Sequence, residues 1–232
     1  MNPTRRDIPS PFGADEPVSR RELNKAATRG AIVAAAVDML RTHPDEPVTA
    51  DRVAEAAGVS RRTFFNYFGS IEAALNAPMD DYLELAVANL GTITECTAAA
   101  EAAVRAIRDT TGAEALRPVA ELFLLAQSNA QLARLQMESW NTCAERIMGI
   151  LQEADADVPP LAAAAFAQAI VGAGRAAFMY WGQNLPPAAA GHSGAALALA
   201  LAPESLGRLQ ATMIEALTQL RDGFPALQAP PA

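Results

Sequence analysis

The chain has 232 residues, of which 51% are hydrophobic and 6% aromatic, and its formal net charge is −8 at pH 7. This length provides one larger domain or two small ones, with enough apolar side chains for a core. Alanine dominates the composition, whereas β-branched and aromatic residues at alternating spacing are scarce. Because alanine favours helices and those residues favour strands, the composition predicts an all-α protein and disfavours a β-rich one.

The acidic charge is unevenly distributed. Residues 1–70 hold ten Lys and Arg against nine Asp and Glu, whereas residues 71–232 hold eight against seventeen. Nucleic-acid binding needs cations that face phosphates locally, so the net charge does not exclude it. A solvated acidic helical surface gives the same pattern, and the distribution alone is weak evidence.

Membrane and secreted proteins are not indicated. The apolar stretch from Leu161 to Trp181 contains Gln168 and Arg175, and no run of about 18 uncharged apolar residues exists. The polar N-terminus lacks the apolar region of a secretory signal. Two lone cysteines, at positions 96 and 143, fit a reducing cytoplasm better than a disulfide framework, so we expect a cytoplasmic protein.

Patterns typical of enzymes and metal sites are missing from the sequence. The segment Gly191–Ala195 lacks the last glycine of a G-x-S-x-G nucleophile elbow and follows no predicted strand. Two histidines and two lone cysteines do not have the spacing of zinc ligands, and no phosphate-binding loop or dinucleotide fingerprint occurs. We therefore expect no enzyme, no cofactor and no bound metal.

Helical periodicity and capping residues divide the chain into helices. Thr49 and Ser60 are expected N-caps, and Gly58 lies where a sharp turn needs a left-handed residue. The first helices are expected at about residues 19–41, 49–58 and 60–69, with a fourth from residue 70 and later breaks near 91–97, 110–112, 128–129, 155–160 and 184–203. The expected organisation is a flexible arm at 1–18, a helix-turn-helix unit at 19–70, a helical domain at 71–224 and a flexible tail at 225–232.

The third helix has two distinct faces. At 100° per residue, Phe64, Tyr67 and Phe68 fall on one side. The other side carries Arg62, Phe65, Asn66 and Gly69, and Arg61 lies at its N-terminal edge. Such a face suits the major groove of DNA, because arginine pairs with guanine edges and asparagine with adenine. An ordinary helical hairpin has the same spacing, so spacing alone does not decide.

The segment resembles the N-terminal domain of the TetR (tetracycline repressor-like) family over about residues 20–76. In that family the second helix opens with Thr, a Gly-Val/Ile-Ser turn follows, and the next helix ends in a Thr-Leu-Tyr-x-His-Phe-like string before an apolar helix. This chain has Thr49, Gly58-Val59-Ser60, Thr63-Phe64-Phe65-Asn66-Tyr67-Phe68, and then Ile71 and Leu75.

The resemblance implies contacts to double-stranded DNA. It gives phosphate or sugar contacts to Thr49, Thr63 and Tyr67, and base reading to Arg61, Arg62 and Asn66. Lys25 and Arg29 resemble the family's backbone-clamping cations, although a solvated helix face explains them equally well. Two positions depart from the family. Phe65 replaces the usual Tyr and loses a hydroxyl, and Ile71 stands where many members have a phosphate-binding Lys.

The C-terminal half carries two patterns that suit a dimer interface. A stripe of small residues recurs every four positions and an apolar seam has 3-4-4-3 spacing. They comprise Ala165, Ala169, Ala173 and Ala177, and Leu206, Leu209, Met213, Leu217 and Leu220. Intrachain core is the alternative, but a palindromic operator requires a two-fold symmetric reader.

Large or adaptable side chains on the middle helices are candidates for a ligand pocket. They are Phe123, Met137, Trp140, Asn141, Met148, Phe178 and Trp181. Individually each is more often plain core, but as a set they suggest a mainly apolar ligand. The sequence thus predicts a homodimeric repressor that a small molecule releases from its operator. The alternative is a helical small-molecule binding or carrier protein whose DNA contacts have decayed.

Overall fold

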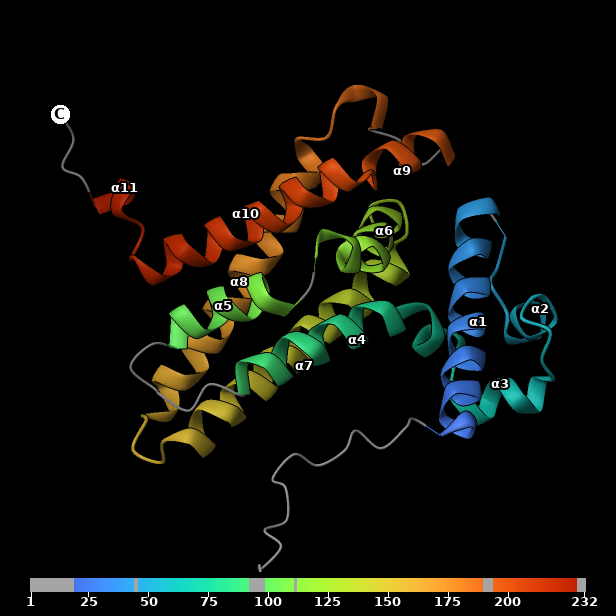
Figure 1. Cartoon of the computed structure of the whole chain (residues 1–232), viewed down its shortest axis with the longest axis horizontal. Coiled ribbons are helices and arrows are strands. Elements are labelled where there is room, and N and C mark those ends of the chain that lie inside the picture. Colours follow the sequence, from blue (N-terminus) through green and yellow to red (C-terminus); the bar gives the residue numbers. More distant parts are fainter. Residues whose placement is uncertain (1–18, 44–45, 92–98, 111, 190–193, 229–232) are drawn as a thin grey trace, which may run out of the picture.

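The computed structural model describes residues 19–43, 46–91, 99–110, 112–189 and 194–228 (Figure 1). All regular elements in these ranges are helices, and no strand occurs among them. The prediction of an all-α protein is confirmed. The expected N-terminal arm lies outside the described residues.

Three helices form the N-terminal domain: α1 (Arg20–Thr42), α2 (Ala50–Ala56) and α3 (Arg61–Tyr67). The first begins with a capping box, in which the Ser19 hydroxyl accepts from the Glu22 amide and the Glu22 carboxylate accepts from the Ser19 amide. Figure 1 shows α2 and α3 on the side of α1 that faces away from the C-terminal helices. Among the described helices, α2 packs mainly on α1 and α3.

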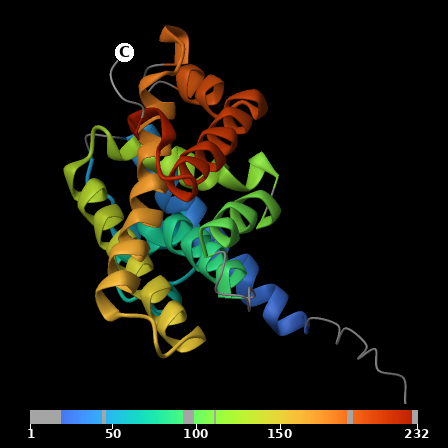
Figure 2. The same cartoon turned by 90° about the vertical axis from the view of Figure 1, so that its left-hand side faces the viewer.

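We call the remaining helices the C-terminal domain. They are α4 (Ile71–Gly91), α5 (Ala99–Thr110), η2 (Ala113–Leu116), α6 (Arg117–Ala126), α7 (Ala130–Ala154), α8 (Pro160–Gln183), η3 (Pro187–Ala189), α9 (Gly194–Ala200), α10 (Pro203–Arg221) and α11 (Pro225–Gln228). Helix α4 packs on α1 at one end and along α7, while α10 packs along α8 (Figures 1 and 2). The short helix α11 occupies a segment that the sequence predicts to be a flexible tail.

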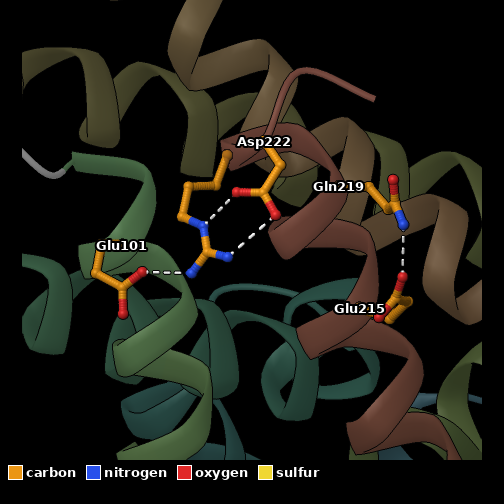
Figure 3. Close-up of polar contacts among 5 residues, drawn as sticks. Glu101, Glu215, Gln219 and Asp222 are labelled. Carbon is orange, nitrogen blue, oxygen red and sulfur yellow. Dashed lines mark hydrogen bonds and ion pairs between the residues drawn. The ribbon is translucent and has the colours of Figure 1, made fainter. Parts of the chain in front are cut away.

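An ion-pair network holds α5 against the end of α10. The Arg221 guanidinium donates to the Glu101 carboxylate at 2.6 Å and to the Asp222 carboxylate at 2.7 and 3.1 Å (Figure 3). These hydrogen bonds hold the pKa values of Glu101 and Asp222 below their usual range. Because the groups are solvent-exposed, the network orients α5 more than it stabilises the fold.

The apolar seam of α10 faces the interior of its own chain. Four of the five seam residues are at most 3% exposed: Leu206, Leu209, Met213 and Leu217. Only Leu220 is partly exposed. This burial corrects the expectation that the seam forms a dimer interface, because side chains covered by α5 and α8 are not available to a second copy. Ala177 of the α8 stripe is likewise buried, at 1% exposure.

Helix α8 has a face, apolar except for Gln168, that the described residues leave uncovered. Among the described helices it is long and apolar enough, by length and composition alone, to cross a membrane. It packs along α7 and α10, however, and its buried side belongs to the core. Its outward side carries Leu161, Ala165, Gly172, Met179 and Tyr180 as exposed residues.

Substitutions at two glycines, Gly58 and Gly30, test the backbone geometry of the N-terminal domain. Gly58 has φ +67°, and no heavy atom lies within 4 Å of an added Cβ. Gly58→Ala is therefore expected to lower the free energy of unfolding by about 1–2 kcal/mol through backbone strain alone. Gly30→Ala, the same chemical change in the exposed middle of α1, is expected to raise it by about 0.5–1 kcal/mol. Urea denaturation measures both, and effects of the same sign would contradict this assignment.

Candidate nucleic-acid interface

The connection from α2 to α3 is a sharp turn with every cap satisfied. The Val59 amide donates to the Ala54 carbonyl at 2.9 Å and the Gly58 amide to the Glu55 carbonyl at 3.1 Å, which is a Schellman motif. The Ser60 hydroxyl then accepts from the Thr63 amide at 3.0 Å and starts α3. Together these bonds fix the angle at which α3 leaves the turn.

The inner side of α3 anchors it to the domain core. Phe64 is fully buried and Phe68 is 6% exposed, and their ring centroids lie 6.1 Å apart. Val53 and Ala54 of α2 are buried in the same cluster. The predicted division of α3 into two faces is confirmed for Phe64 and Phe68, whereas Tyr67 is only half-buried.

The outer side of α3 carries the predicted base readers. Arg61, Arg62, Phe65 and Asn66 are all exposed. The side chains of Arg62 and Asn66 have no hydrogen bond or ion pair among the described residues. Their guanidinium and amide groups are therefore available for base edges, and no rearrangement of α3 is needed to present them.

Arg61 is held in place by two neighbours. Its guanidinium donates to the Asp51 carboxylate at 2.5 Å and lies over the Phe65 ring, 5.2 Å from the centroid. Both contacts lie on the exposed face of α3. They orient the Arg61 side chain and leave it able to extend toward DNA. Sequence reasoning missed Asp51, because its pairing with a residue ten positions away depends on the turn geometry.

The predicted phosphate contacts lie around this face. Thr49 is the exposed N-cap of α2, and its hydroxyl accepts weakly from the Arg52 amide at 3.4 Å. Thr63 is half-buried, and its hydroxyl is 2.8 Å from that of Ser60. Lys25 is exposed on α1. Ile71 packs against the core at the start of α4, so it presents no group to a phosphate.

The Arg29 side chain is paired with another residue of the chain. Its guanidinium donates to both carboxylate oxygens of Asp81 at 2.6 and 2.7 Å and lies 5.4 Å from the Phe68 ring centroid. The bidentate pair joins α1 to α4, and the stacking joins α1 to the end of α3. The expected contact of Arg29 with the DNA backbone stays a prediction, and in the structure the side chain connects α1 to α4 and to the end of α3.

Most predicted pocket residues lie together, but as packed core. Ring centroids are 5.4 Å apart for Phe123–Phe178, 6.5 Å for Phe123–Trp181 and 6.1 Å for Trp140–Phe178. The Trp181 ring nitrogen donates to the carbonyl and hydroxyl oxygens of Ser205, each at 3.1 Å. Met148 is half-buried, whereas Met137 and Asn141 are exposed and lie outside the cluster's interior.

The hollow spaces of the C-terminal domain differ in character. An apolar cavity of about 60 Å³ lies beside Trp140, Ile147 and Met213. A polar cleft of about 480 Å³ lies between α4 and α7, lined among others by Asn76, Asp80 and Ser139. Sequence reasoning missed the cleft, because its residues are ordinary polar positions on two separate helices.

The geometry of α2, its turn and α3 defines a helix-turn-helix DNA-binding protein: a short anchoring helix, a fixed turn and an exposed basic and amide face. Residues 32–77 match the model of the tetR family of bacterial regulatory proteins. This match confirms the predicted TetR-family DNA-binding segment at the N-terminal end of the chain. No curated protein sequence matches the chain.

Proposed function

We propose that the protein is a homodimeric, sequence-specific repressor that a small molecule releases from a palindromic operator in the cytoplasm. The main support for sequence-specific DNA binding is the outer face of α3, where Arg62 and Asn66 are exposed and unpaired within the described chain. The base readers in this proposal are Arg61, Arg62 and Asn66. Thr49, Thr63, Tyr67 and Lys25 contact the backbone, and the Phe65 ring packs against a sugar or a thymine methyl group.

The uncovered side of α8 supports the homodimer. Leu161 is 82%, Met179 50% and Tyr180 61% exposed. Small residues such as Ala165 and Gly172 lie between them on the same side, so a second helix can approach closely. Helix α8 is long and apolar enough, by length and composition alone, to cross a membrane. Exposing such an apolar stripe to water is unfavourable, which favours its burial against a second copy of the chain. In this proposal the interface is the α8 face and not the seam of α10.

The connection through α4 supports control by a ligand. Helix α4 packs on α1 in the DNA-binding domain and along α7 in the C-terminal domain. The Arg29–Asp81 pair fixes α1 to α4. A ligand that shifts α4 against α7 therefore moves the reading head, and two heads that must reach paired half-sites tolerate only small shifts.

In vitro selection from a random DNA library tests the proposal. The expected product is a palindrome with half-sites about one helical turn apart. Sedimentation should give a free particle of twice the 24.4 kDa chain mass, and two chains per duplex on DNA. Enrichment of no sequence at low salt would contradict the repressor and favour a helical binding or carrier protein.

A further inference from the structure

The ion pair between Asp51 and Arg61 crosses the turn of the helix-turn-helix unit. Asp51 lies in the first turn of α2, and Arg61 is the first residue of α3. The Arg61 Nη1 atom donates to the Asp51 Oδ2 atom at 2.5 Å. The two side chains are 61% and 64% exposed, so the pair adds little to the free energy of unfolding. Its main effect is on the position of the Arg61 guanidinium group.

Ring contacts hold the same guanidinium group from a second side. Its central carbon lies 5.2 Å from the centroid of the Phe65 ring. That ring meets the Phe64 ring edge-on, with the centroids 5.2 Å apart and the ring planes at 84°. Phe64 is fully buried in the core. The guanidinium group is therefore placed by α2 through Asp51 and by the core through Phe65, and both contacts order it before DNA binds.

The hydrogen bond to Asp51 occupies only part of the guanidinium group. Arginine has several N–H donors, and the bond to Asp51 is made by Nη1. The Nε and Nη2 groups remain for the O6 and N7 acceptors of a guanine edge. The carboxylate also offsets the charge of Arg61, so the pair as a whole gains little from contact with a DNA phosphate. The arrangement therefore suits base reading better than backbone binding.

We propose that Asp51 is a positioning residue that sets specificity: it restrains Arg61 to base reading and disfavours its contact with phosphates. This inference rests on the base-reading role of Arg61 in the proposed function. Complexes with unselected DNA are held mainly by cations on phosphates, whereas a selected site also uses base edges. A guanidinium group that is paired and stacked contributes less to the first kind of complex than to the second. Asp51 therefore increases discrimination mainly by weakening binding to the wrong DNA.

Glu55 supplies a matched control on the same helix. Its side chain is exposed one helical turn after Asp51. Its carboxylate makes no hydrogen bond or ion pair with another described residue. Glu55→Gln and Asp51→Asn are equal changes of charge that nearly preserve the shape of the side chain, but only Asp51→Asn releases Arg61.

Fluorescence anisotropy with the selected duplex and a scrambled duplex tests the role of Asp51. Asp51→Asn is expected to bind the scrambled duplex more tightly than the wild type does. The slope of log K against log salt for that duplex should become steeper by about one, because the released guanidinium group reaches a phosphate. The ratio of the affinities for the selected and the scrambled duplex is expected to fall about three- to tenfold. Glu55→Gln should leave this ratio unchanged.

The Arg61→Ala variant provides the second background for the same measurement. Without the guanidinium group Asp51 has nothing to position, so adding Asp51→Asn to Arg61→Ala should leave the ratio of that variant unchanged. Thermal unfolding followed by circular dichroism checks that each variant is folded.

An unchanged ratio for Asp51→Asn, or an equal fall with and without Arg61, would overturn the positioning role. Weaker binding of Asp51→Asn to both duplexes by the same factor would also overturn it, because that result indicates a purely structural effect. A wild-type protein that binds the two duplexes equally would instead contradict the proposed function, so the two failures are distinguishable.

Discussion

Phe64→Ala is expected to lower the free energy of unfolding by about 3–5 kcal/mol and to abolish DNA binding at ordinary temperatures. The Phe64 side chain is fully buried, and it contacts the rings of Phe65 and Phe68. Helix α3 has only seven residues, which is too short to persist without tertiary packing. Removing its central anchor leaves a cavity and detaches the reading face.

The neighbouring residue supplies the matched control. Phe65→Ala removes the same ring one position away, but this side chain is 44% exposed. Its loss is expected to cost no more than about 1 kcal/mol, mainly through the edge contact with Phe64. Urea denaturation followed by circular dichroism measures both variants. Equal destabilisation by the two substitutions would show that α3 is not seated as described.

Arg62→Ala is expected to remove about 1–3 kcal/mol of discrimination between the selected site and a site altered at one base pair. Its guanidinium is exposed and unpaired within the described chain, so the change disturbs no internal contact. Arg62→Lys keeps the charge but not the two-pronged donor geometry, and it should lose nearly the same discrimination. Fluorescence anisotropy with both DNA sites measures the effect.

Lys25→Ala is the contrasting variant in the same assay. It should weaken binding to both sites about equally and reduce the slope of log K against log salt by about one. The two arginine variants and the lysine variant therefore separate base reading from backbone contact. Uniform weakening by all three would contradict the division of roles.

The local chemistry of the N-terminal domain was predictable from the sequence. Ser60 and Gly58 act through hydrogen bonds within a few residues, so their types and spacing are enough to place the turn. The breaks between the later helices were predictable for the same reason, because they depend on residue types within a few positions. The expectation of two faces on α3 held for Phe64 and Phe68 because helical periodicity alone determines them.

Contacts between distant elements were not predictable. Arg29 and Arg61 both read as free cations, yet Asp81 and Asp51 hold them in the folded chain. The 3-4-4-3 spacing of α10 shows that the helix has an apolar side but not which partner covers it. The partner is α5 and α8 of the same chain. The same reason applies to the aromatic set around Trp181, which packs into core and leaves little space.

Sequence reading by α3 is tested most directly by comparing the wild-type affinity for the selected site with that for a scrambled duplex of equal composition, over a series of salt concentrations. If α3 reads the base sequence, the selected site binds at least about a thousandfold more tightly and both affinities fall with salt. Equal affinity for the two duplexes at every salt concentration would contradict a sequence-reading role for α3.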